Sequence, residues 1–119
     1  MRLRLFPADS ITPAPQDRWP DSDLHLIDIV DRTQHAPFCA GVCELRASTP
    51  VCFHYDDEAV VCYLLEGEIT LTENGEECTV RRGDTVFIPK EEGLAVFWST
   101  SSYGRFFYVT YPHWRSSRM

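Results

Sequence analysis

The feature that most constrains the fold is a hydrophobic alternation with a period of two residues, which runs along most of the chain from Leu24 onward. Such alternation places successive side chains on opposite faces of an extended strand, whereas a helix needs a period of 3.6. The alternating segments are short and are separated by Gly, Asn and Pro. We therefore expect an all-β fold without any helix longer than about three turns.

One segment and one turn carry the most information about the arrangement of these strands. Residues 60–65 are apolar on both faces, which is typical of a strand buried in a closed or double sheet. Asn74-Gly75 lies between two alternating segments and predicts a type I′ turn, because both central residues of that turn need a positive φ. We expect a hairpin between residues 63–73 and 77–82 within a small sandwich or barrel. The predicted strands are 24–30, 38–45, 51–55, 60–65, 68–72, 77–82, 85–88, 94–98 and 105–111.

A chain of 119 residues has room for one domain and one core. Residues 1–22 contain Pro7, Pro13, Pro15 and Pro20 and predict an extended arm, because proline fixes φ and removes hydrogen-bond donors. We assign residues 23–114 to the barrel and 115–119 to a tail. Small barrels leave strand edges, and the arm is placed to cross between subunits, so we expect a homodimer.

The formal net charge of −7 argues against partners that are themselves polyanions. A surface of that sign repels nucleic acid and anionic lipid, so we expect neither as a partner. The start of the chain lacks the apolar core of a signal peptide and no apolar run has membrane-spanning length, which predicts a cytoplasmic protein. Ser117-Arg118-Met119 fits the relaxed form of the peroxisomal address, so a peroxisomal or glycosomal location is the alternative.

The chain contains five cysteines, an odd number, and none forms a CxxC pair. Several alternate with apolar residues along predicted strands. We expect buried thiols in a reducing compartment rather than a disulfide framework or a zinc site.

Three segments together resemble the double motif of the cupin superfamily. They are Tyr63-Leu-Leu-Glu-Gly-Glu68, the Asn74-Gly75 turn, and Gly83-Asp-Thr-Val-Phe-Ile-Pro-Lys90. Phe87–Lys90 and Arg105–Pro112, followed by Trp114, are similar to the closing segment of the ethanolamine-utilisation EutQ family. Cupins similar to ureidoglycine aminohydrolase are the next closest. The resemblance covers about 24–114 and implies a small cupin β-barrel of the RmlC-like jelly-roll type.

The resemblance also implies where metal ligands would lie, because metal-binding cupins use an H-x-H pair, a Glu and a second His. In this chain Val60 takes the position of the Glu and Val96 that of the second His. His54 and Asp56 occupy the H-x-H positions in one register, and Val51 and Phe53 occupy them in another. Valine cannot ligate a metal, so we expect no conventional transition-metal site.

The candidate catalytic residues are Glu58, Asp56 and His54. Asp56, Asp57 and Glu58 form either a solvated acidic turn or, for Glu58, a general base or ligand acceptor at the mouth of the barrel. His54 lies between aromatic residues, as a hydrogen-bonded core residue or as a proton carrier facing a cavity.

The candidate substrate-binding residues are either aromatic or basic. Tyr63, Trp98 and Tyr108 either pack the barrel or line a pocket for a small organic ligand. Lys90 and Arg105 either are surface charges or meet an anionic substrate.

The resemblance implies acetate kinase activity, the transfer of a phosphoryl group between acetyl phosphate and ADP. Mg²⁺ with a nucleotide would then be held by Asp56, Asp57 or Glu58, and Lys90 or Arg105 would meet the phosphate. The residues themselves support this weakly, because the chain has no Walker loop and no Gly-rich phosphate cradle. The alternatives are a metal-free cupin that binds a small molecule without catalysis, and an assembly component, for which an exposed apolar face is expected. The cofactor and the ligand are left open.

Overall fold

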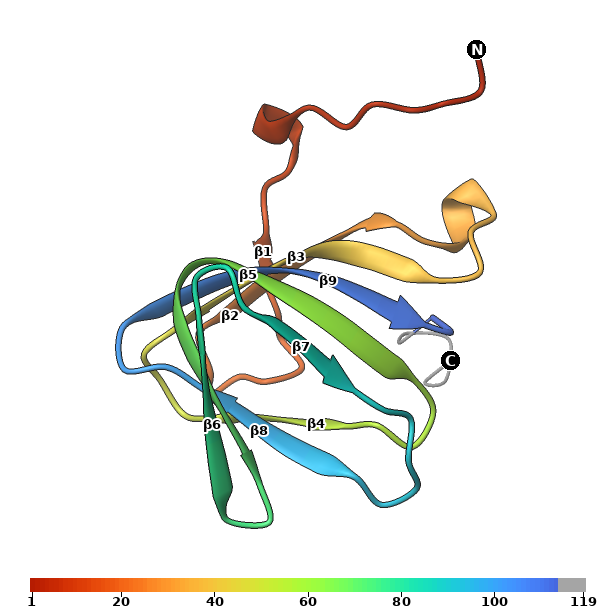
Figure 1. Cartoon of the computed structure of the whole chain (residues 1–119). Helices are drawn as coiled ribbons and strands as arrows, with labels where there is room; N and C mark the ends of the chain where they lie inside the picture. Colours follow the sequence, from red (N-terminus) through yellow and green to blue (C-terminus); the bar gives the residue numbers. More distant parts are fainter. Residues whose placement is uncertain (114–119) are drawn as a thin grey trace.

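Two antiparallel layers share one long strand in the computed structural model, which describes residues 1–113 (Figure 1). The larger layer has the order β1-β2-β3-β9-β5-β7, and the smaller layer has the order β4-β8-β5-β6. The strands are β1 (Ala14–Pro15), β2 (Leu24–Val30), β3 (Cys39–Arg46), β4 (Val51–His54), β5 (Ala59–Glu73), β6 (Glu76–Arg81), β7 (Thr85–Ile88), β8 (Ala95–Ser99) and β9 (Tyr103–Tyr111). The helical elements of residues 1–113 are two 3-10 turns, Ala8–Ser10 and Arg32–Gln34.

Strand β5 belongs to both layers because it bends in its middle. Its first half pairs with β7 as far as Tyr63 and with β9 as far as Gly67, and its second half, from Glu68, pairs with β6 and β8. The register with β9 shifts between Leu64 and Glu66, and Gly67 has a φ of +72°. An added Cβ on Gly67 would lie 2.0 Å from the carbonyl oxygen of Tyr103. Only glycine allows this left-handed conformation and this close approach together.

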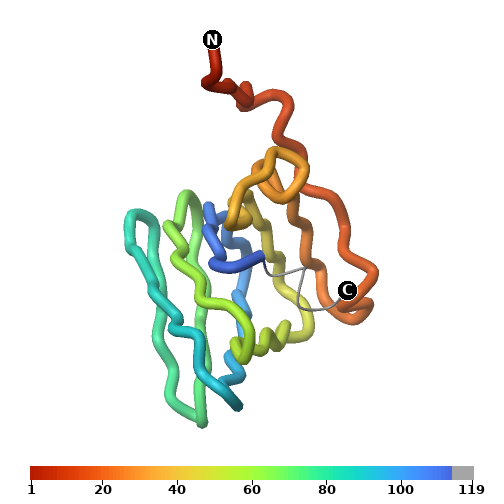
Figure 2. The backbone as a smooth tube through the Cα atoms, turned by 90° about the vertical axis from the view of Figure 1, so that its right-hand side faces the viewer, coloured from red at the N-terminus to blue at the C-terminus, as the bar shows by residue number. Residues whose placement is uncertain are grey.

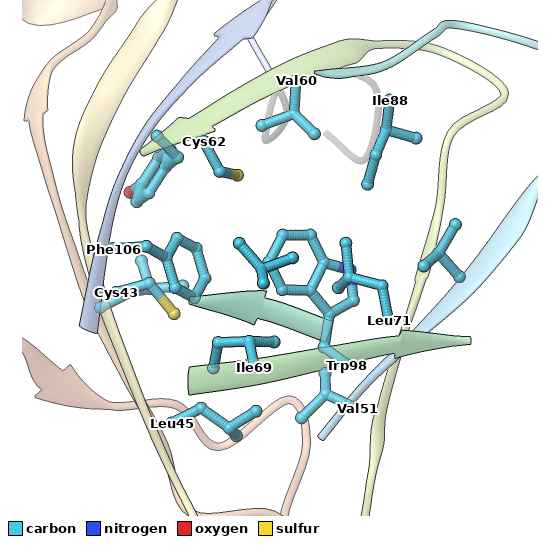
Figure 3. Close-up of a cluster of buried hydrophobic side chains, with 14 of the residues drawn as sticks. Cys43, Leu45, Val51, Val60, Cys62, Ile69, Leu71, Ile88, Trp98 and Phe106 are labelled. Carbon is cyan, nitrogen blue, oxygen red and sulfur yellow. The ribbon is translucent and has the colours of Figure 1, made fainter. Parts of the chain in front are cut away.

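The core lies between the two layers, where the inward-facing side chains of each strand meet (Figure 3). Strand β9 shows the alternation clearly, because Phe106 and Tyr108 are buried whereas Phe107 is exposed. The same alternation buries Val60, Cys62 and Leu64 of β5. Trp98 from the smaller layer stacks on Phe106 from the larger one, with ring centroids 4.9 Å apart. This contact joins the layers across the interior.

The predicted all-β architecture is confirmed, with two corrections to the strand boundaries. Segments 60–65 and 68–72 are one continuous bent strand, because Gly67 turns the chain without breaking its pairing. The predicted hairpin forms across Asn74-Gly75, but its arms are residues 68–73 and 76–81. Tyr63 pairs instead with Thr85 and Phe107 in the larger layer.

The ends of the chain differ from the predicted division in detail. Residues 1–13 stand away from the two layers in both views, while Ala14 and Pro15 already pair with β2 (Figures 1 and 2). The proposed targeting tripeptide Ser117-Arg118-Met119 lies outside the described residues. Within residues 1–113, no helix is long and apolar enough to cross a membrane.

The bend at Gly67 yields a prediction with an internal control. Gly67→Ala should lower the free energy of unfolding by at least about 3 kcal/mol, because the new methyl group meets backbone atoms that cannot move without breaking the β5–β9 pairing. Gly75→Ala should cost only about 1–2 kcal/mol, because Gly75 has a similar φ of +79° but open space around it. Urea unfolding measures both values. Equal losses would show that conformation alone, and not the close approach, matters at Gly67.

Candidate functional site

A cavity of about 60 Å³ lies between the layers, next to the start of β5. Its walls are mainly apolar and aromatic, and its polar groups are one carboxylate, three hydroxyl groups, two thiols and one indole N–H. The lining residues are Leu26, Cys43, Phe53, Tyr55, Glu58, Val60, Cys62, Trp98, Phe106, Tyr108 and Thr110. They come from both layers and from the loop between β4 and β5, so the cavity exists only once the layers have packed.

Glu58 reaches this cavity because the loop that carries it is tied to a second loop. Asp56 accepts a hydrogen bond from the backbone N–H of Gly93 at 2.7 Å. The backbone N–H of Tyr55 donates to the carbonyl oxygen of Leu94 at 2.9 Å, and its carbonyl accepts from the N–H of Glu91 at 3.0 Å. These bonds hold Asp56 at the surface, while Glu58 is only 4% exposed. The acidic turn therefore combines a structural carboxylate with a buried one.

The Tyr55 hydroxyl group accepts a hydrogen bond from Nε1 of Trp98 at 3.0 Å. Burial raises the pKa of Tyr55 well above 10.0, and the Cys62 thiol and then the Glu58 carboxylate add to this rise, while the bond from Trp98 opposes it. Tyr55 is therefore a neutral phenol at physiological pH, and its O–H remains a hydrogen-bond donor.

Tyr108 and Thr110 supply hydroxyl groups from β9. The Tyr108 hydroxyl donates to the carboxylate of Asp28, and the carbonyl oxygen of Ile27 lies 3.2 Å from it. Gly41 makes room for this arrangement, since a Cβ there would lie 2.5 Å from the Tyr108 hydroxyl oxygen. The buried Oγ1 of Thr110 has no hydrogen-bond partner within residues 1–113. A ligand in the cavity would find this atom available.

Two thiols face the interior on the side of the larger layer (Figure 3). Burial raises the pKa of Cys62 to about 12, from 9.0. Burial also raises the pKa of Cys43 well above 9.0, with smaller contributions from Cys62 and Glu44. Both groups are therefore neutral thiols at physiological pH, which makes them poor nucleophiles and metal ligands.

The structure brings some of the sequence candidates together and separates the others. Glu58, Trp98 and Tyr108 line the cavity. His54 and Asp56 are exposed, Tyr63 is 45% exposed on the outer side of the larger layer, and Lys90 is exposed after β7. Arg105 lies on the same outer side and pairs with Glu44 at 3.3 Å.

Sequence reasoning missed several groups at the cavity. The sequence pattern could have identified Thr110, because it lies two residues after Tyr108 and so shares the inward face of β9. Tyr55, Cys43 and Cys62 fall within predicted strands, and the sequence pattern assigns the two cysteines no role beyond that of buried thiols. Asp28 gave no signal, because it belongs to β2 and meets Tyr108 only through tertiary packing.

The residues present do not fit the transition-metal site that the cupin resemblance implies. Val60 lines the cavity and Val96 is buried in the core, so the two positions discussed above carry aliphatic side chains. Asp56 and Asp57 are exposed while Glu58 is buried, so they do not converge on a Mg²⁺ ion either. Within residues 1–113, no three His, Cys, Asp or Glu side chains are grouped closely enough to hold a metal.

Comparisons with known proteins agree on one family. The family described as "Ethanolamine utilisation protein EutQ" matches residues 15–116. The curated "Acetate kinase EutQ" of Salmonella typhimurium is 33% identical over 93 residues, which are 76% of this chain and 38% of that protein, and the Escherichia coli protein of the same name is 32% identical over 93 residues. The chain thus spans well under half the length of these curated relatives.

Solved structures with this fold include members of the same family and more distant proteins. The crystal structure of the ethanolamine utilisation protein Q from Salmonella typhimurium has a TM-score of 0.83 at 24% identity, covering 92% of this chain and 86% of that one. Ectoine synthase from P. lautus has a TM-score of 0.77 at 14% identity, covering 93% and 79%. At these identities the likeness shows the fold alone.

The raised pKa of Cys62 leads to a prediction for alkaline stability. The pKa of this thiol is 9.0 in the unfolded chain, and burial raises it to about 12 in the folded protein. The contribution of this thiol to the free energy of unfolding is therefore fully present below about pH 9. It is lost as the pH rises toward about 12, and the total loss is at most about 4 kcal/mol. Urea unfolding between about pH 8 and about pH 10.5, with a reductant present, should show stability falling in this range.

Two variants assign this loss of stability to the buried thiol. Cys62→Ala should show a shallower decline with pH, whereas Cys78→Ala, which changes an exposed thiol, should keep the slope of the original protein. Identical slopes for the two variants would contradict the assignment.

Proposed function

This chain belongs to the EutQ family of ethanolamine-utilisation proteins and is a cupin, and from this we propose that its cavity binds a small amino alcohol of the size and charge of ethanolamine. The observation that carries the proposal is that one small cavity is lined by both a buried carboxylate, Glu58, and a buried hydroxyl group, Thr110. Family membership supplies the chemical class, and the cavity supplies the size and polarity.

The volume restricts the ligand to very few atoms. A buried water needs roughly 10–15 Å³ of such space, so a cavity of about 60 Å³ takes about four groups of that size. Ethanolamine has four non-hydrogen atoms. A nucleotide is many times larger and cannot enter a space of this volume.

The described side chains of the lining favour a cation over an anion. Among the described residues that line the cavity, Glu58 is the one with a charged side chain type, and no Lys, Arg or His is present. An ammonium group beside Glu58 would form a charge-assisted hydrogen bond, which offsets part of the cost of removing both ions from water. A carboxylate ligand such as acetate would instead place two like charges together.

The remaining groups suit the rest of an amino alcohol. Thr110 Oγ1 is a buried polar atom that would gain a partner in the ligand hydroxyl group. Phe53, Trp98 and Phe106 offer apolar contacts to the two methylene groups. Tyr55 can donate its O–H while accepting from Trp98.

Calorimetric titration with a matched ligand series tests this proposal. Ethanolamine should bind, while ethylene glycol, which lacks the ammonium group, should bind at least about 10-fold more weakly. Ethylamine, which lacks the hydroxyl group, should bind about 3- to 10-fold more weakly than ethanolamine. Binding of acetate in preference to ethanolamine would refute the proposed charge of the ligand.

Variants then locate the site. Glu58→Gln should weaken ethanolamine binding by about 10- to 100-fold, and Thr110→Val, which keeps the shape of the side chain, by about 3- to 10-fold. Asp56→Asn is the matched control, because Asp56 lies two residues away but is exposed outside the cavity. Equal losses for Glu58→Gln and Asp56→Asn would place the site elsewhere.

Acetate kinase activity is a second candidate function, favoured by one observation, the name of the curated relatives. Phosphoryl transfer would need Mg²⁺ and cationic groups around the phosphate. Lys90 is exposed and Arg105 pairs with Glu44 on the outer side, so neither faces the cavity.

Incubation of the purified chain with acetate, ATP and Mg²⁺, followed by trapping of acetyl phosphate with hydroxylamine, tests this second function. Acetyl phosphate formed by the original protein and lost in Glu58→Gln would favour a kinase over an amine-binding protein. Formation that is unchanged in Glu58→Gln would remove this residue from the kinase mechanism.

A further inference from the structure

We propose that Cys52 and His54, on the outer side of the smaller layer, form a binding site for Zn²⁺. The Sγ atom of Cys52 lies 3.9 Å from the Nε2 atom of His54. Sulfur and imidazole nitrogen are ligand atoms that Zn²⁺ prefers, whereas Mg²⁺ is bound through oxygen atoms. The pair therefore has the ligand chemistry of a zinc site, and two protein ligands leave two positions of a tetrahedral ion for water or for a donor atom of another molecule.

Strand β4 holds these two side chains on one face. It pairs with β8 and is the edge of the smaller layer in the described part of the chain (Figure 1). Val51 is buried and Phe53 lines the cavity. Because side chains alternate along a strand, Cys52 and His54 point to the opposite side. The proposed zinc site is therefore separate from the cavity that we assign to the amino alcohol.

The separation of the two ligand atoms fits a shared zinc ion. Bonds from Zn²⁺ are about 2.3 Å long to sulfur and about 2.0–2.1 Å long to an imidazole nitrogen. Two such ligands are about 3.6 Å apart at the tetrahedral angle, and about 4.4 Å apart when they lie on opposite sides of the ion. The observed distance of 3.9 Å lies between these limits. The two side chains therefore already have the spacing that the ion requires.

Cys52 is accessible to a metal ion, unlike the interior thiols of Cys43 and Cys62. Cys52 is partly exposed and His54 is exposed, whereas both interior cysteines are buried. Burial raises the pKa of Cys52 above its usual 9.0, so the free thiol is neutral. When Zn²⁺ binds, the S–H bond breaks, a Zn–S bond forms, and the proton leaves to the surrounding water.

The neighbouring strand gives the sulfur atom an apolar surrounding. Phe97 of β8 lies opposite Cys52 and is 48% exposed. Residues that lie opposite each other in an antiparallel pair are close enough for side-chain contact. An apolar neighbour limits the access of water to a metal–sulfur bond, so Phe97 would help to retain the bound ion.

Cys78 provides a matched control for the thiol of Cys52. It is an exposed cysteine of β6. Neither β6 nor its partner β5 contains a histidine. Cys78 therefore has a free thiol but lacks the adjacent imidazole that completes the pair on β4.

Calorimetric titration of the full chain with Zn²⁺, with a phosphine as the reductant, tests the proposal. Zn²⁺ should bind to the original protein. Cys52→Ala and His54→Ala should each weaken this binding by about 10-fold or more, because each removes one ligand. Cys78→Ala should bind Zn²⁺ as tightly as the original protein. Failure of the original protein to bind Zn²⁺, or equal losses for Cys52→Ala and Cys78→Ala, would overturn the proposal.

Co²⁺ identifies the ligand atoms directly, because a cobalt–thiolate bond gives a charge-transfer absorption band in the near ultraviolet. The original protein and Cys78→Ala should show this band, and Cys52→Ala should lack it. Zn²⁺ should abolish the band by displacing Co²⁺, while an excess of Mg²⁺ should leave it unchanged. Circular dichroism verifies that each variant is folded. A band that persists in folded Cys52→Ala would place the metal on another thiol and overturn the proposal.

Discussion

The bend of β5 at Gly67 is the constraint on which both layers depend. Its first half pairs with β7 and β9 and its second half with β6 and β8, so this one strand is the pairing partner of four of the other eight strands. The carbonyl oxygen of Tyr103 lies only 2.0 Å from the place that a Cβ of residue 67 would take. Because β9 passes this close to the bend of β5, the two layers are held at a fixed separation. The stacked rings of Trp98 and Phe106 fill the space between them.

The same strand connects the interior to the outer surface. Val60 and Cys62 face the cavity, whereas Val61 and Tyr63 are exposed on the outer side of the larger layer. Any change that shifts β5 along its axis therefore acts on both sides of the layer.

Two positions at which the cupin resemblance implies metal ligands carry valine in this chain. Val60 lines the cavity and Val96 is buried in the core, and the polar groups of the cavity are a carboxylate from a loop together with hydroxyl groups, thiols and an indole N–H. In such surroundings thiols and phenols stay neutral, as the raised pKa values of Cys62 and Tyr55, caused mainly by burial, indicate.

The sequence by itself determined the strands, the Asn74-Gly75 hairpin, the cupin family and the replacement of two ligand positions by valine, because these depend on local periodicity, turn geometry and motif spacing. It also placed Glu58, Trp98 and Tyr108 among the candidates. Only the tertiary structure decided that Glu58 enters the cavity while Asp56 caps a loop, since their separation depends on hydrogen bonds to Gly93 and Leu94. Likewise, Asp28 meets Tyr108 across 80 residues of chain. Contacts between distant segments arise from packing, and no local pattern encodes which side chains will meet.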